Sequence, residues 1–436
     1  MSDLPPGWTE ARLGEICSKV SKHDPRERPG EPFAYIDIGG IASNRIVETK
    51  ALLGSEAPSR ARQIVAEGDT VLSTVRTYLK KTAIVPAELD GATASTGFCV
   101  LRPAGEIEPR FLFYRVTEHG FVRELSAQQT GSSYPAVRES DVLEQRVPVP
   151  PLNEQRRIVA AIEEQLSRLD AADASLSIAS TRSSVLRTVT IVSALDGGWP
   201  SSAVGEVAQV ISGPAFKSAD FRGVGEGIRL LRGENIEPGA LRWLDTKTWP
   251  ESMLDGYEHL FVGQADLILA MDRPVISSGL KLARVRPDDL PALLVQRVAR
   301  IRPGDQVLSE FLHLALQLPR FVPHLIGNQT GTQLPHITLA GIRAFPVPVP
   351  PLEEQRRIVA RVEEQLSAID ALRAGIERAQ RRSATLRRAV LERAFQGKLV
   401  PQDPTDEPAE TLLTRIRAER AAAPKPCRRA TSREAF

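Results

Sequence analysis

The residues best suited to chemistry form two short clusters of basic and hydroxyl side chains. Each cluster follows a strand-like run, Asp69–Val75 in one case and Asp266–Met271 in the other. The clusters comprise Arg76, Thr77, Tyr78, Lys80 and Lys81, and Arg273, Ser277, Ser278 and Lys281. Arginine can donate to a guanine edge, and hydroxyl and ammonium groups can hold phosphates. Both clusters therefore predict DNA contact, with an ordinary solvated loop as the alternative.

Two polar loops that contain glycine form a second set of candidates. Such loops can bring backbone N–H groups and hydroxyls to phosphates, and glutamine can read adenine. The candidate side chains are Gln129, Ser132, Ser133, Gln329, Thr332 and Gln333. The alternative is a loop that closes its domain and directs the chain into the next helix. Lys217, which follows Ile211-Ser212-Gly213, is a further candidate for DNA contact.

No recognisable catalytic or metal-binding pattern accompanies these clusters. The chain lacks a GxxxxGK[ST] phosphate loop, a GxGxxG turn after a strand and an HExxH pair. Its six histidines include no i,i+4 pair, and none lies beside a cysteine. Asp288-Asp289 could be a nuclease carboxylate pair, but a solvated turn is the simpler interpretation. We therefore expect no catalytic residue, metal or cofactor in this chain.

Composition limits the kind of partner and the setting. A net charge of +2 is too small for general electrostatic binding to nucleic acid, so DNA contact must come from local patches. No apolar run reaches the roughly 18 residues of a membrane helix. Three widely spaced cysteines and an N-terminus without an apolar stretch predict a reduced, cytoplasmic protein without a disulfide framework.

The elements that must position the clusters occur twice. Val147–Asp170 reads VPVPPLNEQRRIVAAIEEQLSRLD, and Val347–Asp370 reads VPVPPLEEQRRIVARVEEQLSAID, 200 residues later. The common register extends over at least positions 101–170 and 301–370. A chain with two copies of one unit is expected to have two-fold pseudo-symmetry, and duplex DNA is a natural partner for two similar readers.

Each copy is expected to consist of a globular α/β part and a long helix. Strand-like runs, together with helices at Phe111–Phe121 and Phe311–Phe321, predict a twisted sheet in both globular parts. After the repeated prolines, apolar residues recur at helical or heptad spacing, which predicts two long helices packed on each other. The predicted core of this pair is Ile158, Ile162, Leu166, Leu169, Ile358, Val362, Leu366 and Ile369, and it continues through Ala172, Leu176, Leu372 and Ile376.

The arginine pairs Arg156-Arg157 and Arg356-Arg357 lie near the starts of these helices. A symmetric phosphate clamp is one interpretation. We favour a solvated helix face that pairs with nearby glutamates or contacts a partner subunit.

The two PLxEQRRIV helix starts and the C-terminal stretch AFQGKLVPQDPTDEPAETLLTRIRAER resemble the specificity (S) subunit of type I restriction-modification enzymes. The resemblance implies two DNA target recognition domains and two conserved helices that form an antiparallel coiled-coil spacer. It implies a chain without chemistry of its own that binds double-stranded DNA and two methyltransferase (M) subunits, which would carry S-adenosylmethionine. Motor-nuclease (R) subunits can join such complexes. Gly331–Ile337 fits the family's turn before the helix, whereas Gly131–Val137 fits it loosely.

The resemblance assigns five segments to the chain. They are recognition domain 1 at 1–150, a central spacer helix at 151–196, recognition domain 2 at 197–350, a distal spacer helix at 351–396, and a C-terminal tail with a short helix, Ala409–Arg420, at 397–436. Three alternatives remain open: the S subunit of a modification-only system, a coiled-coil adaptor that binds only proteins, and a catalytic nuclease or methyltransferase.

Overall fold

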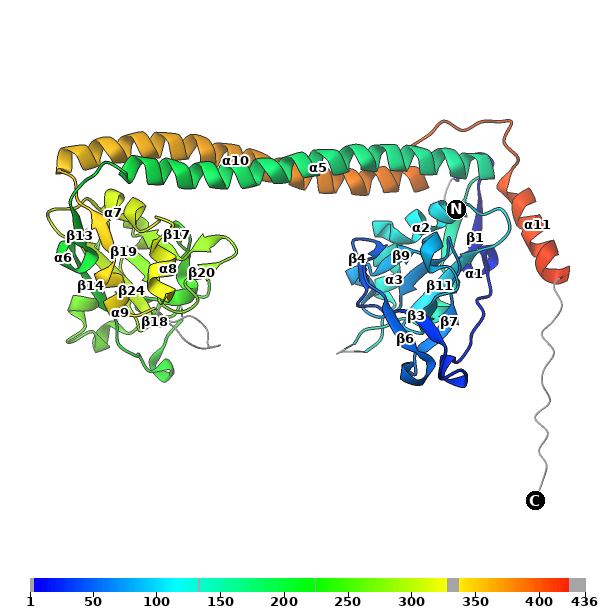
Figure 1. Cartoon of the computed structure of the whole chain (residues 1–436), viewed down its shortest axis with the longest axis horizontal. Coiled ribbons are helices and arrows are strands. Elements are labelled where there is room, and N and C mark those ends of the chain that lie inside the picture. The colour runs from blue at the N-terminus through cyan, green and yellow to red at the C-terminus, as the bar shows by residue number, and fades with distance from the viewer. Residues whose placement is uncertain (1–3, 132–133, 224, 328–336, 423–436) are drawn as a thin grey trace, which may run out of the picture. The chain divides into compact units, whose positions relative to one another are not determined.

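The computed structural model describes residues 4–131, 134–223, 225–327 and 337–422 (Figure 1). The chain divides into two compact units, and both long helices run through the division. Unit 1 contains Met1–Ser175 and Ala379–Phe436, and unit 2 contains Leu176–Arg378. Each unit therefore combines one globular domain with part of both helices.

The globular domain of unit 1 contains two small four-stranded sheets. One has the antiparallel strand order β2-β11-β8-β9, and the other has the order β6-β3-β10-β7 with a parallel β3–β10 pair. Strands β1 and β12 pair separately and bring the two ends of the domain together. The strands are β1 (Thr9–Arg12), β2 (Cys17–Ser18), β3 (Pro32–Ile36), β4 (Ile41–Ala42), β5 (Arg45–Ile46), β6 (Lys50–Leu53), β7 (Ala61–Ile64), β8 (Thr70–Ser73), β9 (Thr82–Ile84), β10 (Thr93–Ser95), β11 (Phe98–Pro103) and β12 (Arg146–Val149).

The globular domain of unit 2 repeats this topology. Its antiparallel sheet has the order β14-β24-β19-β22, its second sheet has the order β18-β15-β23 with a parallel β15–β23 pair, and β13 pairs with β25. The strands are β13 (Ser201–Ala203), β14 (Ala208–Ser212), β15 (Ile228–Leu231), β16 (Ile236–Glu237), β17 (Ala240–Leu241), β18 (Thr248–Trp249), β19 (Leu267–Ala270), β20 (Val275–Ile276), β21 (Gly279–Leu280), β22 (Leu282–Arg284), β23 (Ala292–Leu294), β24 (Val298–Pro303) and β25 (Pro346–Pro348). The predicted pair of α/β domains is confirmed.

The predicted domain helices are interrupted in both copies. Phe111–Phe121 was expected to form one helix, but α2 (Pro109–Thr117) and α3 (His119–Ala127) meet at Glu118. The Glu118 carboxylate accepts hydrogen bonds from the backbone N–H groups of Gly120 and Phe121, at 2.6 and 3.0 Å, and so caps a new helix. In unit 2, α7 (Ser309–Ala315) and α8 (Phe321–Ile326) are separated at the corresponding place. Short helices α1 (Leu13–Ile16), α4 (Glu139–Leu143), α6 (Val204–Val207) and α9 (Leu339–Ala344) complete the domains.

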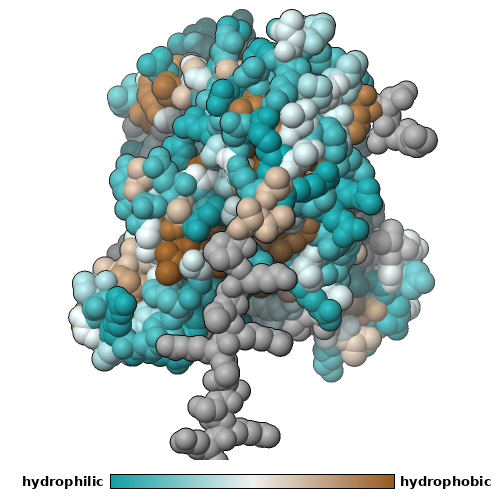
Figure 2. Space-filling view, turned by 90° about the vertical axis from the view of Figure 1, so that its right-hand side faces the viewer, coloured by the Kyte–Doolittle hydropathy of each residue, from teal (hydrophilic) through white to brown (hydrophobic). Residues whose placement is uncertain are grey.

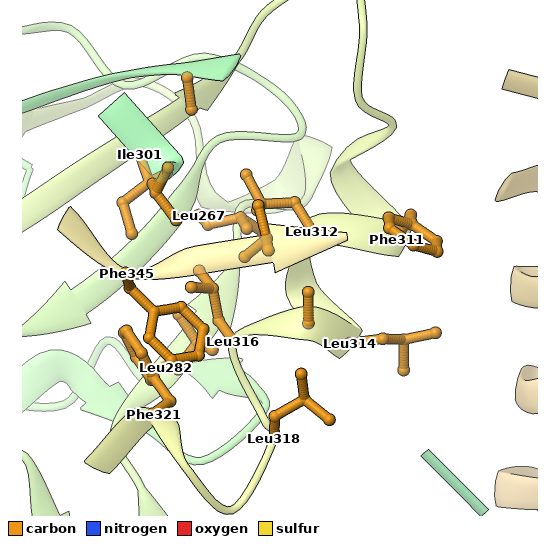
Figure 3. Close-up of a cluster of buried hydrophobic side chains, with 14 of the residues drawn as sticks. Leu267, Leu282, Ile301, Phe311, Leu312, Leu314, Leu316, Leu318, Phe321 and Phe345 are labelled. Carbon is orange, nitrogen blue, oxygen red and sulfur yellow. The ribbon is translucent and has the colours of Figure 1, made fainter. Parts of the chain in front are cut away.

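The core of unit 2 joins the sheet, the domain helices and the long helices. In Figure 3 the Phe321 and Phe345 rings lie together, with a centroid distance of 4.7 Å, and Leu282 and Leu316 lie beside them. Leu267 of β19 packs near Leu312 of α7 in the same cluster. This cluster includes residues of both long helices, so the domain and the helix pair share one core.

The long helices are α5 (Leu152–Leu195) and α10 (Leu352–Phe395). They lie side by side as a coiled coil (Figure 1), and within each unit the N-terminal part of one helix packs on the C-terminal part of the other. The pairing is therefore antiparallel. Buried core positions are Ile158, Ile162, Ile358, Val362, Leu366 and Ile369, with Leu166 and Leu169 partly buried, so the predicted seam is confirmed at these residues.

The expected seam is wrong at one position of each helix. Ala172 and Leu372 are exposed, whereas Asp173 and Arg373 are partly buried. The observed seam advances by steps of four or three residues, and the inward-facing position after Leu169 is Asp173, four residues on.

Ion pairs repeat across the coiled coil at positions 200 residues apart. Arg187 lies 3.1 Å from Asp370 in unit 2, and Arg387 lies 2.6 Å from Asp170 in unit 1. Arg387 also contacts Asp173, at 2.8 Å. The residue of α10 that corresponds to Asp173 is Arg373, which cannot pair with an arginine. This third contact therefore belongs to unit 1 alone. These contacts fix the register between the two helices.

The C-terminal helix α11 (Ala409–Ala422) packs on the first globular domain. Leu412, Leu413 and Ile416 are buried in the same cluster as residues of β2, β11 and α2. Arg420 donates to the carbonyl oxygen of Gly14 at 2.8 Å and to that of Cys17. From the side on which α11 lies, the surface is mostly hydrophilic with small separate hydrophobic patches (Figure 2). The tail is thus an integral part of unit 1.

Among the described residues, no helix is both long and apolar enough to cross a membrane.

Candidate nucleic-acid interface

An ion pair between an arginine and a buried aspartate anchors the strand that carries each candidate loop. Arg102 of β11 binds Asp69, just before β8, with a closest distance of 2.7 Å. Arg302 of β24 binds Asp266, just before β19, also at 2.7 Å. Both carboxylates are buried, and the hydrogen bond to its aspartate raises the pKa of each arginine. The loops at the other ends of β8 and β19 therefore start from rigidly held strands.

Each loop then turns at an arginine in a left-handed backbone conformation. The φ angle is +49° at Arg76 and +45° at Arg273. Residues other than glycine, asparagine and aspartate rarely adopt this backbone conformation, and those that do often lie at functional sites. The two arginines occupy corresponding places, so both domains turn their loops in the same way.

A second loop of the first domain lies against Arg76. The Arg76 backbone N–H donates to the Pro135 carbonyl at 2.8 Å, and the Arg76 guanidinium lies 5.0 Å from the centre of the Tyr134 ring. Thr130 and Ala136 pair as an isolated bridge, and the Gln129 side chain donates to the Pro135 carbonyl at 3.3 Å. The structure thus brings together Gln129 and Arg76, which come from separate predicted candidate sets.

Several predicted contact residues have structural roles in the loops. The Lys81 ammonium donates to the Ile41 carbonyl, and the Lys281 ammonium donates to the Gly233 carbonyl. These matched lysines tie each loop to a neighbouring segment of its domain, at β4 in unit 1 and at the turn just before β16 in unit 2. Thr77 is buried, with its hydroxyl 2.7 Å from that of Ser126. The phosphate contact by Thr77 stays a prediction, and the burial of its hydroxyl beside Ser126 argues against it.

The remaining candidates lie at the surface or outside the described residues. Tyr78, Arg273, Ser277, Ser278 and Lys217 are exposed. Burial, followed by the charge of Arg388 on α10, lowers the pKa of Lys80. Ser277 and Ser278 border a groove of about 760 Å³ in unit 2. The candidates Ser132, Ser133, Gln329, Thr332 and Gln333 lie outside the described residues.

Sequence reasoning missed three residues beside the loops. Tyr134 stacks on Arg76, and no sequence signal indicates this contact. Arg388 acts on Lys80 from another element, which only the packing of α10 on the domain reveals. Arg297 has a φ of +62°, pairs with Asp272 at 2.7 Å and corresponds to Gly97 in the first copy. The sequence has an arginine at position 297 where the first copy has glycine, and this difference could have singled out Arg297.

The repeated PLxEQRRIV motif forms the joint between each domain and its helix. Gln155 accepts from the Glu108 backbone N–H at 3.0 Å and donates to the Pro150 carbonyl at 2.9 Å. Gln355 makes the same two contacts, with Leu308 at 2.8 Å and Pro350 at 2.8 Å. Both glutamines are fully buried. Their side chains satisfy one backbone N–H group and one proline carbonyl at each joint.

The adjacent arginines mostly pair with acidic side chains, as interpreted from the sequence. Arg356 pairs with Glu353, and Arg357 lies 3.5 Å from Glu354. Arg157 instead binds Asp406 of the tail at 2.6 Å. A symmetric phosphate clamp finds no support in these contacts.

The acidic pair Asp288-Asp289 has a structural role. Asp289 is buried and accepts from the Trp243 indole N–H and the Arg286 backbone N–H, both at 2.8 Å. The expected solvated turn is therefore wrong at Asp289. Within the described residues, no group of three or more His, Cys, Asp or Glu side chains could hold a metal ion.

The chain thus contains two repeated domains, each with an anchored strand and a loop that carries exposed polar side chains. A family model described as "Type I restriction modification DNA specificity domain" matches residues 5–173 and 197–380. The chain belongs to this family.

Named relatives and solved structures agree with this assignment. The specificity subunit of the type I restriction enzyme EcoAI from Escherichia coli is 33% identical over 203 residues, which are 46% of this chain and 34% of that protein. The MjaVIII specificity subunit from Methanocaldococcus jannaschii is 27% identical over 263 residues, which are 57% of this chain and 60% of the relative. The matches therefore span about a third to three fifths of these relatives.

Two solved chains cover most of this one. The crystal structure of the HsdS subunit from Thermoanaerobacter tengcongensis has 30% identity and a TM-score of 0.55, and the match covers 91% of this chain and 98% of that one. A chain from a structure on complex assembly and conformational transition of the type I R-M system has 30% identity and a TM-score of 0.79. That match covers 91% of this chain and 100% of the other.

Proposed function

We propose that this chain is the non-catalytic DNA-recognition subunit of a type I restriction-modification complex. Each globular domain reads one half of a bipartite target, and the helix pair sets the gap between the halves. The observation that carries this proposal is that a loop follows an anchored strand at the same place in both domains and turns at a left-handed arginine, Arg76 or Arg273. Family membership indicates DNA as the ligand of these loops.

We further propose that the long helices dock methyltransferase subunits, which bind S-adenosylmethionine. An exposed apolar stripe on α5 supports this. It consists of Ile178, Val185, Leu186, Val189 and Val192. Their spacing places them on one helix face, and such a row normally requires a covering partner. The corresponding positions of α10 carry one large apolar side chain, Leu386. The other four are Arg378, Thr385, Ala389 and Glu392.

Methylation mapping tests the function directly. The chain is expressed in a host with its methyltransferase partner, and methylated sites across the genome are compared with and without this gene. We expect a split, asymmetric motif that disappears with the gene. A soluble complex that methylates no gene-dependent motif would contradict DNA recognition, and the absence of any complex would support the protein-binding adaptor instead.

Two arginine variants assign the half-sites. We expect Arg76→Ala to relax or weaken reading of one half and Arg273→Ala that of the other, because a good arginine–guanine contact contributes about 1–3 kcal/mol of discrimination. Arg28→Ala and Arg222→Ala serve as controls, since both arginines are exposed and lie outside these loops. Equal effects of either loop variant on both half-sites would show that its arginine is not a base reader.

A further inference from the structure

Both domains expose a pair of apolar side chains at the same distance after the left-handed arginine. Tyr78 and Leu79 follow Arg76 by two and three residues and are 53% and 52% exposed. Val275 and Ile276 follow Arg273 by the same steps and are 46% and 40% exposed. Exposed apolar side chains are common singly, but a matched pair in two divergent loops indicates a shared use.

The backbones that present these pairs differ. In unit 1 the pair lies on a single 3₁₀ turn, Thr77–Leu79, which is tied to α3 through Thr77 and Ser126. In unit 2 the pair forms strand β20, which is held in a hairpin by β21. Lys81 and Lys281 brace the far side of each loop. Two unlike backbones therefore arrive at the same exposed apolar pair in the same place.

The surroundings of each pair indicate its ligand. In unit 1 the pair is flanked by Arg76 and Lys80, and in unit 2 by Arg273, Ser277 and Ser278. A pair of apolar groups set among cations and hydroxyls does not fit a hydrophobic protein groove. It fits the major groove of DNA, where phosphates and base edges are polar and the one apolar group is the C5-methyl of thymine.

We propose that Tyr78–Leu79 and Val275–Ile276 contact thymine C5-methyl groups, one pair in each half of the target. The proposal rests on the proposed function and adds a chemical feature that each domain reads. Arginine and glutamine would select hydrogen-bonding edges, while the apolar pair would select a methyl group at a neighbouring base pair.

Deoxyuridine substitution tests the contact. Uracil keeps every hydrogen-bonding group of thymine and lacks only the methyl. The assembled methyltransferase complex is given duplexes in which each thymine of the mapped motif is replaced singly. Since a buried methyl contributes about 0.8 kcal/mol, we expect about four-fold weaker binding for at least one position in each half-site.

Serine variants connect this effect to the named residues. In Tyr78→Ser/Leu79→Ser, the uracil effect should vanish in one half-site and persist in the other, and Val275→Ser/Ile276→Ser should give the reverse. The persisting effect shows in the same sample that the complex is folded. Tyr78→Phe keeps the ring and should retain the effect. Leu53→Ser and Met253→Ser remove exposed apolar side chains elsewhere in each domain, and they should leave the uracil effect unchanged in both half-sites.

The proposal is overturned if uracil replaces every thymine of a half-site without loss of binding. It is also overturned if the serine variants keep the full uracil effect, or if a half-site contains no A·T pair. These outcomes differ from failure of the proposed function, in which no gene-dependent methylated motif exists. A gene-dependent motif with no uracil effect leaves DNA recognition in place and removes methyl reading alone.

Discussion

At the residue scale, buried polar side chains explain why some positions are identical in the two copies while their loops diverge. Gln155 and Gln355 each satisfy a backbone N–H and a proline carbonyl at the joint between domain and helix. Loss of either side chain would leave buried backbone groups unpaired, at a cost of roughly 1–3 kcal/mol. The exposed loop residues have no such constraint, so they are free to differ between the two domains.

His313 makes the stability of unit 2 depend on pH. Burial, followed by the charges of Arg284 and Arg187, lowers its pKa to about 4, while Glu310 opposes this shift. The unfolded chain takes up the same proton near pH 6.5. Between these values the unfolded state binds more protons than the folded state, so stability falls as pH drops from about 6.5 to about 4.

We therefore expect His313→Phe, which places the residue found at the corresponding position Phe113, to remove part of the acid sensitivity. The free energy of unfolding is measured at pH 7 and at pH 4.5 for both proteins. The wild type should lose on the order of 2 kcal/mol more than the variant over this range. Equal losses would show that His313 does not contribute to acid sensitivity. Carboxylates titrate in both proteins, so their contribution cancels in the comparison.

At the element scale, α11 completes the core of the first domain. Its buried side chains join the cluster of β2 and β11, and Arg415 binds Glu106 at 2.8 Å. The tail therefore stabilises the N-terminal domain, although α11 begins more than 250 residues after that domain ends.

We expect Ile416→Glu to detach α11, because it places a carboxylate in an apolar cluster and removes a buried isoleucine, at a cost of about 3 kcal/mol or more. Hydrogen exchange of α11 and β2 is the measurement, and exchange should accelerate in both. Ala418→Glu is the matched control, since Ala418 is exposed on the same helix. Protection that remains unchanged in the Ile416 variant would show that α11 is not part of the domain core.

At the scale of the whole molecule, the proposed spacer role makes the gap between half-sites depend on the length of the coiled coil. The seam advances by three- and four-residue steps, so whole heptads can be added without changing which residues face inward. A single turn added to one helix would disrupt this register and the ion pairs of Arg187 and Arg387.

We expect a heptad inserted after Ser175 in α5, together with one after Arg381 in α10, to lengthen the preferred gap. Seven residues extend a helix by about 10.5 Å, and DNA rises about 3.4 Å per base pair. The gap should therefore grow by about three base pairs, as read from the methylated motif. The insertion in α5 alone is the control and should lower methylation at every gap. An unchanged gap in the double insertion would refute the ruler role.

The repeats in the sequence were sufficient to predict two α/β domains, the paired helices and most of their core, because apolar periodicity and proline stops are local signals. The clusters that follow β8 and β19 were found for the same reason. The seam error at Ala172 and Leu372 arose because a helical face and a heptad seam diverge after a few turns.

Only the tertiary structure decided which side chains reach the surface. Thr77, Lys81 and Lys281 are of suitable types for phosphate binding, yet they hydrogen-bond within their domains because their hydroxyl or ammonium groups face nearby backbone and side-chain oxygens. The left-handed arginines, the exposed apolar pairs and the docking of α11 likewise depend on contacts between residues far apart in sequence. Local pattern determines the elements, whereas burial, which is a property of the folded chain, determines which of their side chains remain available for DNA.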